Sequence, residues 1–402
     1  MEVELTNEQR GIQDYVFDWL GSNKQQYIAI SGYAGTGKTT LIGDTARQMR
    51  SDLNIKFLTF TGKASVVLSN KLVDYGINDN DICSTLHSYL YRFLGKDNCG
   101  SLKFTRKFRE ELDGDVLIVD ESSMLNSKLF SDILNLNRPI IFVGDPGQLP
   151  PINDEVFKPL LDTDLVLKHI HRQAWDNPII RLATQTRKQQ PIKPGNYDGA
   201  AAKVSKRSNK GIDLLAKFKE NIGEVDSVIL CAKNKTRVKL NSQVRQAKGY
   251  GGNHPLPGER LVCLKNNKEK ELMNGQCVFV KSTKVLEEDL AYKLVVVPEG
   301  RTNEIECLAY AKTFNNSTPQ KIGMEIRKDE KRLKEIQQTH FITGDPVLFD
   351  YGYALSVHKA QGSEWERVVL MDERMMSQTK GDYFRWLYTG ITRAKEKLLI
   401  LS

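Results

Sequence analysis

The sequence predicts an α/β protein whose N-terminal part is a doubly wound parallel sheet. Four apolar runs alternate with stretches that can form helices, and polar residues follow each run at its carboxyl end. Strands that alternate with helices form parallel sheets covered on both faces, and ligands collect at the carboxyl edge of such sheets. The expected strands are residues 27–31, 55–60, 116–119 and 139–143.

The composition is that of a globular protein with two or three domains. The chain has 402 residues, of which 40% are hydrophobic and 27% charged, and its net charge is +8. This charge permits nucleic-acid binding without establishing it. The acidic N-terminus lacks a signal-peptide pattern, no stretch approaches a membrane span, and the six cysteines form no C-x-x-C pair. We therefore expect a reduced, intracellular protein without structural zinc.

The stretch from Gly32 to Thr40 fits the phosphate-binding template G-x-x-x-x-G-K-[ST]. A strand is expected before it and a helix after it, a context that a glycine-rich turn with a chance lysine would lack. Successive backbone N–H groups then point at a di- or triphosphate, Lys38 neutralises the β- and γ-phosphates, and the Thr39 hydroxyl takes a Mg2+ position. The expected nucleotide contacts here are Gly32, Ala34, Gly35, Thr36, Gly37, Lys38, Thr39 and Thr40.

A second nucleotide contact is expected from Gln9. It lies in a helix predicted over residues 5–20, with Thr6 as the N-cap. Its amide carries both a donor and an acceptor and can hydrogen-bond an adenine edge. A single glutamine on a helix is more often solvated, so both interpretations stay open.

Two polar clusters follow the later strands of the predicted sheet. Asp120 and Glu121 end the strand at 116–119, where one carboxylate can hold Mg2+ and the other can polarise the attacking water. Two solvated acids at a strand end are the alternative. Gln148, after the strand at 139–143, can sense a γ-phosphate or orient a water.

Residues 89–113 form a basic and aromatic insert. Rings such as Phe93, Phe104 and Phe108 alternate with lysines and arginines. This pattern suits single-stranded nucleic acid, whose bases stack on aromatic rings while cations hold the phosphates. A hairpin that packs its rings on the core is an equally good interpretation.

Taken together, these segments resemble the motifs of superfamily 1 helicases in their RecD-like and phage Dda-like branch. The phosphate loop resembles motif I, Asp120-Glu121 motif II, and residues 144–151 motif III. Residues 61–64 and 85–87 resemble motifs Ia and Ib.

The second half of the chain extends the resemblance. Residues 169–174 resemble the family's His-Arg-Gln motif, residues 353–363 motif V, and residues 388–394 motif VI. The resemblance implies catalytic roles for Lys38, Asp120, Glu121, Gln148, Arg172 and Arg393, nucleotide contacts from Gln361 and Gly362, and a metal site at Thr39 and Asp120. It implies nucleic-acid contacts from Thr61, Lys63, Thr85, His87, Asn234, His358 and Lys359, with Phe104 as the strand-separating wedge and Phe93 and Phe108 as substitutes.

The implied architecture is two RecA-like doubly wound parallel-sheet cores, with a small hairpin insert in the first and a small SH3-like β-barrel insert in the second. The first core would span 1–170, a linker and the first part of the second core 171–275, the barrel insert 276–345, and the rest of the second core 346–402. Within these ranges, residues 187–210 read as a surface loop or linker. The charged stretch 321–338 breaks the β pattern of the insert and has no assigned structure.

The implied function is an ATP-dependent DNA helicase that moves 5′-to-3′ on single-stranded DNA, with ATP and Mg2+ bound between the two cores. Its partners would be single-stranded DNA and duplex forks, contacted mainly through the sugar-phosphate backbone, and replication or recombination proteins. The expected location is the cytoplasm of a bacterial or phage-infected cell. Two alternatives stay open: a DNA-stimulated ATPase or translocase without strand separation, and a nucleic-acid-binding subunit with an inactive ATP site. The complete set of catalytic residues argues against the second alternative.

Overall fold

The computed structural model describes residues 4–22, 24–77, 82–96, 102–151, 154–170, 176–223, 226–267, 269–318, 321–375 and 378–402. The chain divides into two compact units, Met1–Lys188 and Gln189–Ser402, which are considered separately below. No helix within the described ranges is both long enough and apolar enough to span a membrane.

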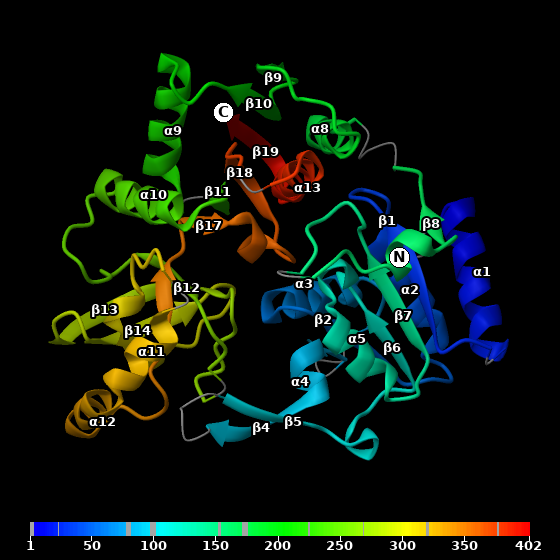
Figure 1. The fold of residues 1–402 in the computed structure, drawn as a ribbon, viewed down its shortest axis with the longest axis horizontal. Helices are drawn as coiled ribbons and strands as arrows, with labels where there is room; N and C mark the ends of the chain where they lie inside the picture. The colour runs from blue at the N-terminus through cyan, green and yellow to red at the C-terminus, as the bar shows by residue number, and fades with distance from the viewer. Residues whose placement is uncertain are drawn as a thin grey trace. The chain divides into compact units, whose positions relative to one another are not determined.

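The first unit is built on a six-stranded sheet with the order β3-β2-β6-β7-β1-β8 (Figure 1). Every neighbouring pair in it is parallel, which confirms the predicted doubly wound sheet. The structure adds two short strands, β3 and β8, to the four that the sequence predicts. The strands are β1 (Tyr27–Gly32), β2 (Ile55–Thr59), β3 (Cys83–Thr85), β6 (Val116–Val119), β7 (Ile140–Gly144) and β8 (Val166–Leu167).

Helices cover both faces of this sheet because successive strand residues point to opposite sides. Ile28 and Ile30 of β1 pack in one apolar cluster with α1, α2 and α3, whereas Ala29 packs in another with α4, α5 and α6. The helices are α1 (Asn7–Ser22), α2 (Lys38–Met49), α3 (Gly62–Val73), α4 (Leu86–Leu90), α5 (Ser127–Leu134) and α6 (Pro159–Asp162), with α8 (Pro178–Arg187) at the end of the unit.

The basic and aromatic insert is an antiparallel hairpin of β4 (Tyr91–Lys96) and β5 (Leu102–Arg106). Part of its apolar surface faces solvent: 62% of Leu94 and 41% of Phe104 are exposed, as is 73% of Phe108 just after the second strand. The hairpin therefore forms as one of the two interpretations expects, but it does not bury all of its rings in the core.

The second unit contains a six-stranded sheet with the order β17-β11-β18-β19-β10-β9. Its pairs are parallel except for the antiparallel edge pair β9–β10. The strands are β9 (Gly195–Tyr197), β10 (Ala201–Val204), β11 (Ser227–Cys231), β17 (Ala354–Ser356), β18 (Trp365–Met371) and β19 (Ala394–Leu401). The helices are α9 (Asn209–Asn221), α10 (Asn234–Ala247) and α13 (Lys380–Ile391).

The prediction that residues 187–210 form a surface loop or linker is wrong. This stretch supplies β9 and β10, and β10 pairs with β19 from Ala201–Leu398 to Val204–Leu401. The local sequence is rich in proline, glycine and alanine and carries little strand signal. Its strands form because the distant β19 supplies the backbone hydrogen bonds, which is a tertiary effect that local propensity does not report.

A small antiparallel β-sheet closes into a barrel between α10 and β17. Its order is β15-β14-β13-β12-β16, and a bridge from Ala309 to Val347 joins the two ends. The backbone N–H of Val347 donates to Leu308 O at 2.7 Å and that of Tyr310 donates to Val347 O at 3.1 Å. The strands are β12 (Arg260–Cys263), β13 (Cys277–Glu287), β14 (Ala291–Pro298), β15 (Ile305–Tyr310) and β16 (Phe349–Tyr351).

The charged stretch without an assigned structure forms two short helices, α11 (Ile322–Lys328) and α12 (Glu330–Thr339). Apolar residues of these helices, Ile322, Leu333 and Ile336, pack on Leu308 and Tyr310 of the barrel. The helices thus hold one apolar side against the barrel and leave their charges in solvent, which explains why a β pattern is absent there.

Candidate nucleotide and nucleic-acid sites

Three predicted nucleotide-binding segments lie together at the carboxyl edge of the first sheet. The phosphate loop follows β1, Asp120-Glu121 follow β6, and residues 145–148 follow β7. Because β6, β7 and β1 are consecutive neighbours in a parallel sheet, their carboxyl ends lie about 5 Å apart from strand to strand. This edge can therefore place a loop of backbone N–H groups, two carboxylates and an amide around one phosphate chain.

The phosphate loop is held by glycine geometry and by its own side chains. Gly35 (φ 80°) and Gly37 (φ 77°) adopt left-handed backbone conformations that favour glycine. A Cβ atom at Gly32 would lie 2.7 Å from the Thr36 hydroxyl oxygen, so no larger residue fits there. The Lys38 ammonium donates to Gly32 O at 2.8 Å and to Tyr33 O at 3.1 Å, which keeps the lysine on the loop.

Gln9 is buried and joins the first helix to the phosphate loop. Its side-chain Nε2 donates to Gly37 O at 3.2 Å, and its Oε1 accepts from the Thr6 backbone N–H at 3.0 Å. Thr6 in turn accepts from the Gln9 backbone N–H, which makes a capping box at the start of α1. The solvated interpretation of Gln9 is therefore wrong, while its contact with adenine stays a prediction.

The residues after β6 and β7 have unusual backbone geometry and burial. Glu121 lies in the left-handed region (φ 54°), and its N–H donates to Asp120 Oδ1 at 2.8 Å. Non-glycine residues persist in this region where the surrounding structure imposes it, and they cluster at functional sites. Gln148 is 5% exposed, and its side-chain carbonyl oxygen has no hydrogen-bond partner among the described residues. Such a buried acceptor is available to a ligand or a water.

Thr39 and Asp120 carry oxygen atoms of the kind that bind a magnesium ion. Mg2+ prefers hard oxygen ligands and is usually held by one or two protein groups together with substrate phosphates. The hydroxyl of Thr39, in the first turn of α2, and the carboxylate of Asp120, directly after β6, supply such oxygens at this edge. No cluster of three or more His, Cys, Asp or Glu side chains that could form a dedicated metal cage occurs in the described ranges.

The expected nucleic-acid contacts of the first unit lie on the adjoining strands of the same edge. The carboxyl ends of β2 and β3 are paired at Thr59 and Thr85. Thr61 caps α3 by accepting from Ala64 N at 3.1 Å, and Thr85 caps α4 by accepting from Ser88 N at 3.2 Å. Lys63 and His87 lie in the first turns of these two helices, so all four predicted residues share one edge.

The hairpin insert is joined to this edge by an aromatic contact that the sequence does not reveal. The rings of His87 and Phe104 meet edge to face with centroids 4.8 Å apart, and His87 also contacts Tyr91 at 4.7 Å. A predicted strand-contact residue and the predicted wedge are thus neighbours.

A second contact missed at the sequence level reaches the phosphate loop from the end of the first unit. The guanidinium carbon of Arg187 lies 3.4 Å from the centroid of the Tyr33 ring, a cation–π geometry. Arg172, which the resemblance places at the γ-phosphate, lies outside the described residues, and its role stays a prediction.

In the second unit, the predicted nucleic-acid contacts lie at the carboxyl ends of two paired strands. The pair β11–β17 ends with Cys231 beside Ser356, and Asn234 follows the first strand while His358 and Lys359 follow the second. Burial lowers the pKa of His358, which favours its neutral form. The Lys359 side chain reaches solvent, but the surrounding protein and the positive charge of Arg237 lower its pKa.

The predicted nucleotide contacts of the second unit also meet at one place. Arg393 is 3% exposed, and its guanidinium donates to Thr389 O at 3.1 Å and to Ser363 O at 3.2 Å. Ser363 directly follows Gly362 (φ 71°) and the buried Gln361. The loop after β17 and the end of α13 therefore hold these three residues as one cluster.

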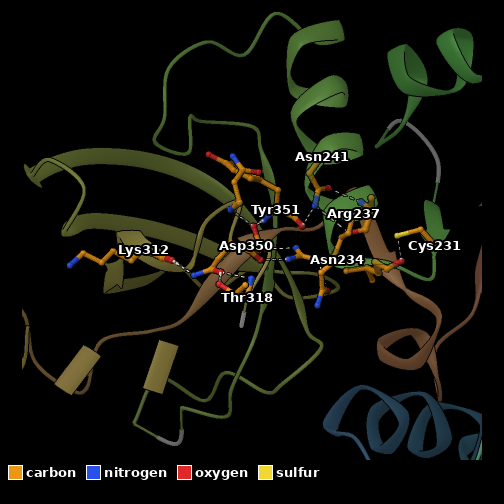
Figure 2. A network of polar contacts seen from close by, with 12 residues as sticks. Cys231, Asn234, Arg237, Asn241, Lys312, Thr318, Asp350 and Tyr351 are labelled. Atoms are coloured by element: carbon orange, nitrogen blue, oxygen red, sulfur yellow. Dashed lines mark hydrogen bonds and ion pairs between the residues drawn. The ribbon is translucent and has the colours of Figure 1, made fainter. Parts of the chain in front are cut away.

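A polar stripe on α10 was not anticipated from the sequence. Asn234, Arg237, Asn241 and Arg245 recur every three or four residues and so share one helix face. All but the first are buried, and these three make side-chain hydrogen bonds to other parts of the unit. Asn234 accepts from Arg237 on the same helix (Figure 2). In the sequence, such spacing is indistinguishable from a solvated helix face.

The fold and the site define a phosphate-loop nucleotide-binding protein with two RecA-like units. Comparisons with known proteins identify the family. An AAA domain model matches residues 5–204, and a UvrD-like helicase C-terminal domain model matches residues 351–401. The RecBCD enzyme subunit RecD of Buchnera aphidicola from Acyrthosiphon pisum is 32% identical, with 93% of this chain and 69% of that protein covered. The ATP-dependent RecD2 DNA helicase of Deinococcus radiodurans is 25% identical over 96% of this chain and 48% of its own length.

The chain belongs to the RecD-like family of superfamily 1 helicases. A solved structure of Pif1 helicases at forked double-stranded DNA superposes with a TM-score of 0.58 and 17% identity over all of this chain and 92% of its own. Bacteroides Pif1 bound to single-stranded DNA gives a TM-score of 0.56 and 16% identity over all of this chain and 93% of its own. These likenesses establish the two-unit fold. The chain spans 37% of an uncharacterised protein of Methanocaldococcus jannaschii and 48% of RecD2.

Proposed function

We propose that the protein is an ATP-dependent DNA helicase that moves 5′-to-3′ along single-stranded DNA and separates the duplex ahead of it. The observation that carries this proposal is the shared edge of the first sheet. Nucleotide-binding segments end β6, β7 and β1, and the predicted strand contacts end the adjoining β2 and β3. Hydrolysis of the nucleotide would therefore take place next to the elements that would hold the DNA.

The proposed chemistry is hydrolysis of ATP with both units contributing groups. Lys38 would neutralise the phosphates, Glu121 would orient and polarise the attacking water, and Gln148 would sense the γ-phosphate. Mg2+ held by Thr39 and Asp120 would neutralise charge that develops on the phosphate oxygens. Arg393 would come from the second unit and Arg172 from the segment before α8. A nucleotide that binds better to one arrangement of the units shifts their equilibrium by that difference in affinity.

The proposed DNA contacts go mainly to the sugar-phosphate backbone. Threonine hydroxyls, an asparagine amide and lysine ammonium groups dominate the two strand-contact edges, and such groups position a strand without reading its sequence. Weak sequence preference and strong dependence on salt are therefore expected. The proposed location is the cytoplasm of a bacterial or phage-infected cell. The proposed partners are DNA forks with replication or recombination proteins.

The decisive experiment measures ATP-dependent unwinding of one labelled duplex that carries either a 5′ or a 3′ single-stranded tail. Opening only with the 5′ tail supports both the activity and the direction. Opening only with the 3′ tail keeps the helicase and contradicts the direction. Lys38→Ala serves as the control without hydrolysis.

A second candidate function is a DNA-stimulated translocase or remodeller that does not separate strands. It shares every nucleotide-binding residue with the helicase and differs only in lacking a working wedge. DNA-stimulated ATP hydrolysis without opening of either tailed duplex would favour this candidate.

A further inference from the structure

A buried ion pair connects α10 to the last strand of the barrel. Arg237 and Asp350 are 5% and 1% exposed, and their guanidinium and carboxylate groups are in contact (Figure 2). Taking both charges out of water costs several kcal/mol per ion unless further hydrogen bonds compensate, so such a pair is weak evidence for stability alone. A role in fixing the positions of the segments that it joins accounts better for the presence of this ion pair.

The remaining hydrogen bonds of the pair show which segments it holds together. Asp350 Oδ1 accepts from the backbone N–H groups of Asn315 at 3.0 Å and Tyr351 at 2.8 Å. Arg237 Nη2 donates to Asn316 O at 2.7 Å. The pair therefore joins the first turn of α10, the barrel strand β16 and the turn that follows β15.

Two predicted nucleic-acid contacts lie next to this pair. Arg237 Nε donates to the side-chain oxygen of Asn234 at 3.4 Å, so one group of the pair holds the acceptor end of this amide, whose other end is a hydrogen-bond donor. Lys359 lies in the segment that directly follows β17, a strand whose start is hydrogen-bonded to the same helix through Asn241. Burial lowers the pKa of Lys359, the positive charge of Arg237 lowers it further, and the negative charge of Asp350 acts in the opposite direction.

Farther along the same helix face, Asn241 holds the chain between β16 and β17. Its Nδ2 donates to Tyr351 O at 3.1 Å, and its Oδ1 accepts from Ala354 N at 2.7 Å. The strand β17 runs directly into the segment that carries His358 and Lys359. The stripe therefore contacts Asn234 directly and holds the start of the strand that leads to His358 and Lys359.

We propose that Arg237 and Asp350 are positioning residues that fix Asn234 and Lys359 against the barrel, so that the grip of the second unit on single-stranded DNA depends on the barrel strand β16. The proposal rests on the proposed function, because it assumes that these residues contact DNA.

The test compares two paired replacements on the same helix face. R237M/D350L removes the pair without leaving one charge buried and alone. R245M/E259L is the matched control, because Arg245 and Glu259 form a second buried ion pair at 2.7 Å at the other end of the stripe. The affinity for a single-stranded oligonucleotide is measured with both proteins well below their melting temperatures, together with ATP hydrolysis in the absence of DNA.

The expected result is a loss of about 10-fold in DNA affinity for R237M/D350L and a change within about twofold for R245M/E259L. Hydrolysis without DNA stays unchanged in both. Adding Lys359→Ala to R237M/D350L has little further effect, whereas adding it to R245M/E259L lowers the salt slope of binding by about 0.7, the loss of one phosphate contact. Additive effects of Lys359→Ala in both backgrounds, or equal losses for the two pairs, would falsify the proposal.

Arg237→Lys keeps the inference testable if the double replacement does not fold. It retains the charge next to Asp350 but loses the fork that reaches Asn234 and Asn316. DNA affinity is expected to fall while the melting temperature changes little, and an unchanged affinity contradicts the proposal. If the wild-type protein binds no single-stranded DNA, the proposed function itself fails, which is distinct from a wild type that binds and variants that bind equally well.

Discussion

The two RecA-like sheets hold their functional groups by different means. At the edge of the first sheet, main-chain turns set the geometry: glycines with positive φ shape the phosphate loop, and Glu121 occupies a left-handed conformation. At the edge of the second sheet, buried side chains set it, because Arg393 donates to Ser363 O and Arg237 donates to Asn316 O, carbonyl oxygens of segments distant in sequence. Local sequence therefore specifies the first site, and tertiary contacts specify the second. Replacements in the two units should consequently fail in different ways.

Lys38→Ala should have the largest effect. Removing a preorganised cation from the phosphate loop is expected to lower ATP hydrolysis by about 100-fold or more. Affinity for single-stranded DNA without nucleotide should stay within about twofold, since the loop and the strand contacts occupy different strands of the sheet. Hydrolysis rates and fluorescence anisotropy measure the two quantities. Retained hydrolysis would contradict the nucleotide site.

Arg393→Lys should lower hydrolysis by about 10- to 100-fold although the charge is kept. A lysine cannot reproduce the fork that donates to Thr389 O and Ser363 O, so the charge is no longer held in place. The exposed Arg367 on β18 provides a control, and Arg367→Lys should leave the rate unchanged. Equal rates for both variants would show that the buried fork is dispensable.

Phe104→Ala should separate strand opening from hydrolysis. Loss of the exposed ring that contacts His87 is expected to lower unwinding by about 10-fold, the order expected when one base-stacking aromatic is removed. DNA-stimulated hydrolysis should be spared, and the exposed Leu94 on the other strand of the hairpin serves as the control through Leu94→Ala. Equal loss of both activities in Phe104→Ala, or of neither, would refute the wedge assignment.

Glu121→Gly should stabilise the first unit while abolishing hydrolysis. Glycine adopts the left-handed conformation without the cost of about 1 kcal/mol that a side chain incurs. Glu121→Gln removes the carboxylate but keeps the strained backbone, so it should be the less stable of the two. Thermal unfolding compares them, and a glycine variant no more stable than the glutamine variant would argue against strain.

His358→Gln should give the smallest effect on stability, which appears in its pH dependence. Burial lowers the pKa of His358 from its usual 6.5, so the unfolded chain binds more protons below that pH. The folded state therefore loses stability as the pH falls from about 6.5 through the lowered pKa. Melting temperatures at pH 7.5 and pH 5.5 should differ less for the variant than for the wild type. An identical difference would mean that His358 titrates normally.

The contrast between the units also explains what the sequence predicts well. The phosphate loop, Asp120-Glu121 and the sheet that carries them depend on neighbours in sequence, and the structure brings them together as expected. The turn at Asn274-Gly275 inside the barrel is also set locally, because Gly275 has a φ of 83° that favours glycine. Features of this kind can be predicted because the residues that determine them are close together in the sequence.

The missed features all depend on distant partners. The strands β9 and β10 need β19, the contact of Arg187 with Tyr33 joins the end of the first unit to its first loop, and the buried face of α10 needs the barrel. Polar residues at helical spacing normally indicate a solvated face, and only the compensating partners show that Arg237 and Asn241 are buried. For two predicted site residues, the structure therefore adds a contact that the sequence does not reveal. Gln9 donates to Gly37 O of the phosphate loop, and Asn234 accepts from the buried Arg237.

The barrel is connected to the rest of the second unit by two chain segments that lie side by side. Because β12 and β16 are antiparallel neighbours, paired at Leu261 and Tyr351, the chain enters and leaves the barrel about one strand spacing apart. The parent sheet keeps its order whether or not a domain sits between α10 and β17, since β11 pairs with β17 directly. The barrel can therefore be replaced by another domain through two neighbouring chain connections. The residues of α10 that contact the barrel would then have to change with it.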